Sequence, residues 1–86
     1  MNYTITYDKN AEDATGKMKV SSISAGKKLT ANAFKRSGWK FVGWNTMADG
    51  SGEFYENKAS FYLEGFSWIF GRQVTLYAQW DLIEYK

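Results

Sequence analysis

The segment Ser37–Gly52, SGWKFVGWNTMADGSG, constrains the fold of this chain more than any other part of the sequence. Trp39 and Trp44 bracket an apolar run, and glycines first interrupt this run and then end it. Aromatic residues are enriched in β-strands, and the sequence Asp-Gly-Ser-Gly is typical of a turn. The segment therefore predicts a strand with a large aromatic surface, followed by a glycine-containing turn.

Aromatic side chains are the main core material available to this chain. Of its 86 residues 19% are aromatic and none is cysteine, so neither a disulfide nor a thiolate-bound metal can hold the fold together. A chain of this length buries only about 60–65% of the surface that it exposes when unfolded. We therefore expect one domain of marginal stability over residues 3–80, with residues 81–86 as a tail or linker.

Two segments alternate cleanly between apolar and polar residues, which is the pattern of a half-buried strand. They are residues 3–7 and residues 74–80. A weaker alternation predicts a strand over residues 17–21, with Met18 and Val20 on one face. We expect the inner sides of these strands to form the core.

The tryptophan-rich segment over residues 39–44 predicts a further strand. A regular strand would place Phe41 and Trp44 on opposite faces, because successive side chains alternate. Both faces would then carry apolar bulk, so we expect this strand to be covered on both sides.

Residues 29–34 predict the one helix of the chain. Leu29 and Ala33 are four residues apart, and Thr30 could cap the first turn. A helix of one or two turns is unstable alone and has to pack on the sheet. The predicted fold class is therefore α+β, with a mixed sheet of four to five strands packed on one short helix.

Catalysis and metal binding have little support in the composition. The chain has no histidine and no cysteine, which removes the commonest general base and the thiolate nucleophile. Glu53 and Glu56 form the best carboxylate pair, but we expect them to be solvated turn residues. A calcium loop needs alternating oxygen ligands and a late bidentate acid, and the partial match is better explained as a polar loop of Asp8, Asn10, Glu12 and Asp13. We predict no catalytic residue, no metal and no cofactor.

The charge pattern argues against a nucleic-acid or membrane ligand. The formal net charge is only +2, and basic doublets occur at 27–28 and 35–36 alone. We expect these doublets to be solvated and expect no nucleic-acid partner. No apolar run approaches the roughly 20 residues of a membrane span, so we expect no direct membrane insertion. We also expect the isolated domain to be monomeric.

Four segments of the chain together resemble the internalin-type B-repeat, also called the Listeria–Bacteroides surface repeat. They are YTITYD at 3–8, GWKFVGWNT at 38–46, ADGSG at 48–52 and TLYAQW at 75–80. The resemblance implies a β-grasp-like, ubiquitin-like fold in a bacterial cell-surface or secreted protein. It also implies that such modules act as spacers or weak adhesion domains without catalytic residues. The aromatic positions that it assigns to the core are Trp39, Trp44, Tyr77 and Trp80.

Residues 64–73 depart from the pattern of that family. Within this insertion, Gly65 and Gly71 bound a run that contains several large apolar residues. Exposed aromatic and arginine side chains are typical of interaction sites, so the candidate partner-binding residues are Phe66, Trp68, Phe70 and Arg72. The alternative is that the insertion folds back and completes a thin core.

The sequence thus predicts a non-catalytic cell-surface repeat module that acts as a spacer or as an adhesion or partner-binding domain. An alternative is a glycan-binding module that uses the exposed aromatics of residues 64–73. A third candidate is a binder of single-stranded nucleic acid, whose affinity would fall steeply with salt.

Overall fold

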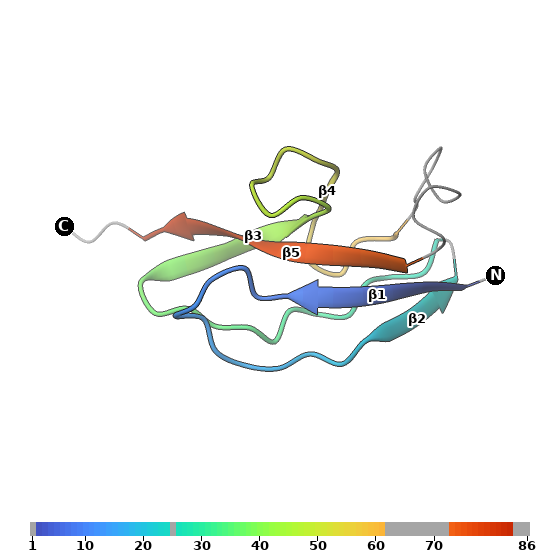
Figure 1. Cartoon of the computed structure of the whole chain (residues 1–86), viewed down its shortest axis with the longest axis horizontal. Helices are drawn as coiled ribbons and strands as arrows, with labels where there is room; N and C mark the ends of the chain where they lie inside the picture. Colours follow the sequence, from blue (N-terminus) through green and yellow to red (C-terminus); the bar gives the residue numbers. More distant parts are fainter. Residues whose placement is uncertain (1, 25, 62–72, 84–86) are drawn as a thin grey trace.

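The structure, a computed structural model, describes residues 2–24, 26–61 and 73–83. Five strands form one mixed sheet in the order β2-β1-β5-β3-β4 (Figure 1). The neighbours β1 and β5 are parallel, and the other pairs are antiparallel. The strands are β1 Asn2–Asp8, β2 Ser21–Ser24, β3 Trp39–Asn45, β4 Phe54–Tyr55 and β5 Gln73–Leu82.

The two cleanly alternating segments form strands, as predicted, and the structure places them side by side within the sheet. Ile5 pairs with Val74, and Tyr7 pairs with Leu76. Because paired residues point to the same face of a sheet, these side chains lie together on one face and are buried. We call the face that carries them the inner face and the opposite one the outer face. Both strands end in polar or exposed residues where the pairing ends.

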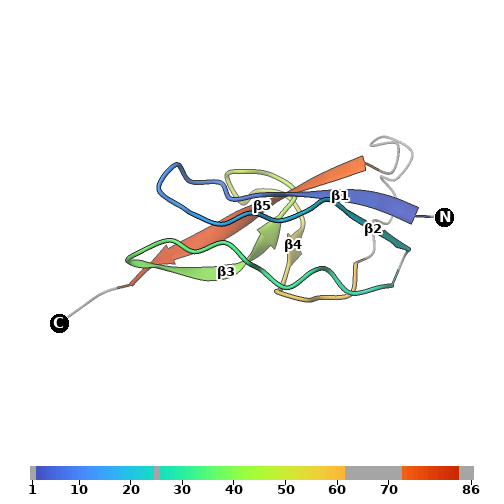
Figure 2. The ribbon, with the colours of Figure 1, turned by 90° about the horizontal axis from the view of Figure 1, so that it is seen from below.

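The helix predicted over residues 29–34 is absent, and the prediction of an α+β, β-grasp-like fold with a packing helix is wrong. The residues described form an all-β fold with a mixed sheet. Residues 26–35 instead run as an extended chain (Figure 2). The Leu29 amide donates to the Ala59 carbonyl, and the Phe61 amide donates to the Lys27 carbonyl.

The extended chain replaces the helix because its backbone groups find partners without helix nucleation, which is unfavourable for one or two turns. The side chain of Asn32 also accepts a hydrogen bond from the Phe34 amide at 2.9 Å, and such local bonds compete with helix formation. Leu29 and Phe34 still reach the core from this extended segment.

The second strand lies later in the chain than predicted. It begins at Ser21, and Ile23 pairs with Tyr3 of β1. Val20 is 58% exposed, whereas Met18 packs against the core from a loop. The pairing partner on β1 decides which residues form this edge strand, and the short apolar alternation at 17–21 could not reveal that partner.

A β-bulge in β3 overturns the predicted faces of this strand. Phe41 pairs with Trp80, but Gly43 already pairs with Gln79, so Val42 is an extra residue on β3. One extra residue reverses the alternation beyond it. Phe41 and Trp44 therefore lie on the same face, with ring centroids 5.0 Å apart.

Trp44 is the centre of the core, but the other rings that the resemblance assigned to the core differ in burial. Trp44 is fully buried and contacts the rings of Tyr7 and Phe34. Trp80 is partly buried and packs against this cluster, whereas Trp39 and Tyr77 lie outside it. A further fully buried ring that the sequence analysis did not single out is that of Phe61.

Replacing Gly43 with alanine is expected to destabilise the domain by about 1–3 kcal/mol, as overpacking typically does. A Cβ at Gly43 would contact the ring of Phe54 and lie 2.8 Å from the Tyr55 carbonyl oxygen. The measurement is the midpoint of urea unfolding. Gly38→Ala is the control, because Gly38 also has a positive φ but nothing lies within 4 Å of its added Cβ. Equal losses at the two positions would contradict a role for the Phe54 ring.

Candidate functional site

The predicted partner-binding residues of the insertion lie outside the residues that the structure describes. They are Phe66, Trp68, Phe70 and Arg72. Their role as a binding surface, and the alternative that the insertion completes the core, both stay predictions.

The outer face of the sheet carries a band of hydroxyl and amide side chains. Thr4 and Thr6 are exposed on β1, and their register partners on β5 are Gln73 and Thr75. Paired residues share a face, and their neighbours Ile5 and Val74 are buried on the inner one. The four side chains therefore form two neighbouring polar pairs on the outer face of the sheet.

Two aromatic rings lie next to this polar band. Tyr77 is half-buried and lies two residues beyond Thr75 on β5. Phe54 is 51% exposed, and its ring lies against Gly43. Since Asn45 pairs with both Tyr77 and Phe54, the two rings belong to one row across the sheet. The outer face thus presents apolar rings beside hydrogen-bonding groups.

A shallow hollow of about 230 Å³ lies at this polar band, lined by Thr46, Gln73, Val74, Thr75 and Tyr77. Enclosed sites for small molecules are usually larger, about 300–1,000 Å³. The hollow is therefore suited to a group that lies on the surface. A sugar ring, with one apolar side and several hydroxyls, matches this combination of a ring with hydroxyl and amide groups.

Asn45 fixes the loop of residues 46–52 that borders the outer face. Asn45 is buried, with only 2% of its surface exposed. Its Oδ1 accepts hydrogen bonds from the Met47 and Gly52 amides, each at 2.9 Å. Its Nδ2 donates to the Gly50 carbonyl at 3.1 Å and to the Gly52 carbonyl at 3.4 Å. The predicted glycine-containing turn is confirmed, and one buried amide organises it.

Asp49 at the tip of this loop is expected to titrate below its ordinary range. The side-chain and backbone hydrogen bonds from Ser51 lower the pKa of Asp49. A lowered pKa in the folded state stabilises the fold above the unfolded-state pKa of about 4, and this contribution is lost as the pH falls through the folded-state pKa. NMR titration of the carboxyl carbon measures this, and Ser51→Ala should raise the midpoint. An unchanged midpoint in that variant would contradict the assignment.

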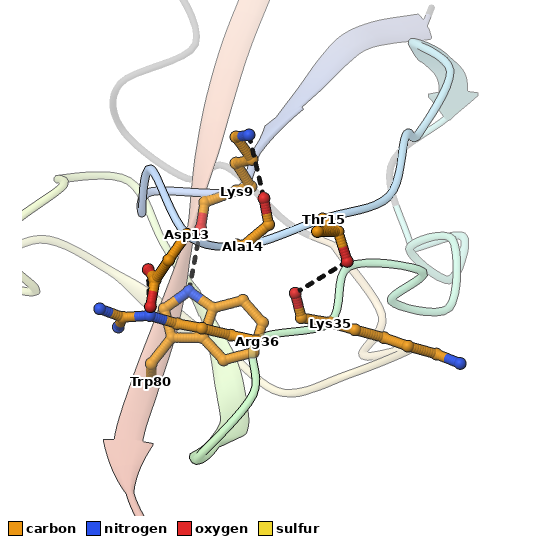
Figure 3. A network of polar contacts seen from close by, with 7 residues as sticks. All are labelled: Lys9, Asp13, Ala14, Thr15, Lys35, Arg36 and Trp80. Atoms are coloured by element: carbon orange, nitrogen blue, oxygen red, sulfur yellow. Dashed lines mark hydrogen bonds and ion pairs between the residues drawn. The ribbon is translucent and has the colours of Figure 1, made fainter.

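Both basic doublets contact the rest of the fold, through the side chain of Arg36 and through the backbone of the lysines. Arg36 Nε donates to Asp13 Oδ1 at 2.7 Å (Figure 3). Its guanidinium also lies 3.8 Å from the centre of the Trp39 ring. The backbone of Lys35 pairs with Thr15, and that of Lys28 pairs with Ser60. Lys27, Lys28 and Lys35 are exposed, as expected for solvated cations. The helix beside which these doublets were expected to lie is absent, so that part of the interpretation is wrong.

The acidic loop after β1 is likewise occupied by internal contacts. Asp8 Oδ1 accepts a hydrogen bond from the Asn10 amide at 2.7 Å, and Asn10 Nδ2 donates to the Ala48 and Ala78 carbonyls. Within the described ranges, no three acidic, histidine or cysteine side chains come close enough to hold a metal ion. Glu53 and Glu56 are exposed.

Sequence reasoning missed the outer face as a candidate surface. The signal was present in residues 74–80, where the polar side of the alternation includes Thr75 and Tyr77. Phe54 could not be found in this way, because its position over Gly43 depends on the pairing of β4 with β3.

Comparison with known proteins connects the chain to one family. Residues 3–79 match the Listeria-Bacteroides repeat domain. Two similar relatives from Evansella cellulosilytica carry provisional names. One, a Gly-rich membrane protein, is 44% identical over 51 residues, which is 59% of this chain and 5% of that protein. The other, a membrane protein, is 32% identical over 83 residues, which is 92% of this chain and 11% of that protein.

The chain therefore spans only a small part of the relatives that it matches. No solved structure matches it. Among the residues that the structure describes, no helix has the length and apolar character needed to cross a bilayer.

Proposed function

This chain belongs to the Listeria–Bacteroides repeat domain family, and we propose that it is a non-catalytic repeat module of a larger bacterial surface protein. The module acts as a spacer or as an adhesion or partner-binding domain. Support comes from the family match over residues 3–79 and from relatives that are named as membrane proteins and are far longer than this chain. The absence of histidine and cysteine from the sequence agrees with a role without catalysis.

The observation that carries the binding role is the outer face of the sheet. It offers the rings of Tyr77 and Phe54 next to hydroxyl and amide groups, and a shallow hollow lies beside Thr75. Loops elsewhere in the fold use their polar groups for internal contacts, as Asn45 and Asn10 do. The outer face is thus the described surface with hydrogen-bonding groups best placed for a ligand.

A glycan is the second candidate function, favoured by the same combination of rings and hydroxyls. Aromatic rings pack against the apolar side of a sugar, while threonine and glutamine side chains can bond its hydroxyls. The aromatic residues of 64–73 could serve the same ligand, and that prediction stands beside the outer face as an alternative surface.

Location is tested in intact cells with the full-length protein. An epitope is inserted after Lys58, an exposed loop residue with φ of 62°. We expect an antibody to label intact cells and an added protease to remove the epitope. Labelling only after cell lysis would contradict a surface role.

Binding is tested on immobilised cell-surface polysaccharides with two double variants, Phe54→Ser with Tyr77→Ser and Phe66→Ser with Trp68→Ser. The control is Val20→Ser with Leu82→Ser, which removes exposed apolar side chains elsewhere. We expect loss of binding in the first variant and retention in the control. Loss in the second variant alone would place the site on the insertion, and no binding by the parent chain would reject the glycan.

A further inference from the structure

The first and last strands of the chain lie side by side in the middle of the sheet and run in the same direction. β1 and β5 are parallel neighbours over five residue pairs, from Thr4 with Gln73 to Asp8 with Tyr77. The chain enters at the start of β1 and leaves beyond the end of β5, at opposite ends of the molecule (Figures 1 and 2). Tension on the two ends therefore acts along these strands, in opposite directions.

This geometry determines how the hydrogen bonds between the strands are loaded. The bonds join the strands sideways, so strands pulled along their axes can separate only by sliding past each other. Sliding strains all the bonds of the pair at the same time. Two strands pulled apart sideways from one end instead lose their bonds one after another, which requires a smaller force.

Two side-chain hydrogen bonds extend this contact beyond the end of β1. Asn10 Nδ2 donates to the Ala78 carbonyl at 2.9 Å, and Trp80 Nε1 donates to the Lys9 carbonyl at 2.9 Å. Figure 3 shows the second bond, between the loop after β1 and the far part of β5. Sliding of β5 along β1 has to break these bonds together with the ladder.

The position of the pair also shields its inner face and its two edges from water. β2 and β3 flank the pair on its two sides, and the inner-face side chains of Ile5, Leu76 and Ala78 are fully buried. A buried hydrogen bond is harder to replace by a bond to water as the strands begin to slide.

We infer that the β1–β5 pair is a mechanical clamp that makes this repeat a load-bearing unit, resistant to unfolding when its two ends are pulled. The load-bearing role rests on the proposed function, because a module is pulled through its two ends only if it is part of a longer surface protein. The clamp itself is a property of the strand arrangement.

The test is single-molecule force spectroscopy of the 86-residue chain in two pulling directions. In the first, the handles are attached at the two termini. In the second, they are attached through Lys40→Cys and Asp81→Cys, which are exposed register partners near the end of the β3–β5 ladder. The natural chain has no cysteine, so the handles attach only there. We expect a several-fold higher rupture force in the first direction, and equal forces would overturn the clamp.

Two matched variants locate the resistance. Asn10→Gly removes the side-chain bond to Ala78. Glycine is chosen because it tolerates the positive φ of 53° at this position. The end-to-end rupture force should fall in this variant. Asn57→Ala removes a bond of similar length, from the Asn32 amide, that lies outside the β1–β5 pair, and should leave that force unchanged. The reverse result would overturn the clamp.

A disulfide crosslink between β1 and β5 is the last part of the test. Thr6 and Thr75 are register partners, so Thr6→Cys with Thr75→Cys should form a disulfide that abolishes the main end-to-end rupture until a reductant is added. A persistent rupture would contradict the path of force. A weak clamp in a protein exposed on intact cells overturns this inference alone, whereas a strong clamp in a protein hidden from antibody overturns the proposed function alone.

Discussion

Replacing Trp44 with alanine is expected to leave the domain largely unfolded. The side chain is fully buried, and its ring lies 4.9 Å from that of Tyr7 and 5.0 Å from that of Phe41. Loss of a buried tryptophan typically costs about 3–5 kcal/mol. A small domain has a total stability of only about 5 kcal/mol. The expected result is loss of the cooperative urea transition, measured by circular dichroism and tryptophan fluorescence.

The matched control is Trp39→Ala, which removes the same side chain from the same strand. Trp39 is only half-buried, and its main described partner is the guanidinium of Arg36, 3.8 Å from the ring centre. Such a contact at an exposed site contributes about 0.5–1 kcal/mol, so we expect this variant to stay folded. Equal losses at the two tryptophans would contradict the central position of Trp44.

Trp44→Phe separates ring volume from hydrogen bonding. The Nε1 of Trp44 is buried and has no hydrogen-bond partner among the described residues. Its removal therefore costs no hydrogen bond, and we expect a smaller loss of stability than in the alanine variant.

The second large effect is expected for Asn45→Ala, with a loss of about 2–4 kcal/mol, because four side-chain hydrogen bonds are lost and each typically contributes about 0.5–1.5 kcal/mol. The substitution removes the acceptor for the Met47 and Gly52 amides and the donor for two glycine carbonyls. Urea unfolding measures the loss. Hydrogen exchange should show faster exchange at the amides of Met47 and Gly52 than at those of β1.

Two further substitutions test that explanation. Asn32→Ala also removes side-chain bonds to a neighbouring backbone, those with Phe34. Asn32 is partly exposed, so water can replace these bonds and we expect a smaller loss. Asn45→Asp keeps the acceptor oxygen but loses the donor to the Gly50 carbonyl, and its effect should be intermediate. A loss at Asn32 as large as that at Asn45 would contradict the role of burial.

The parts of the fold that could be predicted are those in which each residue's environment follows from its close neighbours. The strand at 74–80 can be predicted from alternation alone, since the core covers its inner face and not its outer face. The glycine-containing turn after β3 was recognised from Asp49 and Gly50, whose preference for turns is local. The family was recognised from the same local segments.

The predictions that were wrong concern residues whose partners lie far away in the sequence. The segment at 29–34 has helical spacing, but a helix this short could not form alone. The backbone of residues 27–29, where the segment begins, pairs with residues 59–61 instead. The face of Trp44 depended on one extra residue, Val42, opposite β5. The outer face could not be predicted as a candidate surface for the same reason, since the ring of Phe54 reaches Gly43 only through the pairing of β4 with β3.

The sequence alone determined that this protein is a small strand-rich domain with an aromatic core, because composition and alternation fix which side chains must leave water. Only the tertiary structure decided that the domain lacks a helix in the residues described, that Phe41 and Trp44 share a face, and that β1 and β5 lie in parallel at its centre. The physical reason is that hydrogen bonds between strands join residues up to about seventy positions apart. Local preference cannot specify such partners, whereas the packing of the whole chain can.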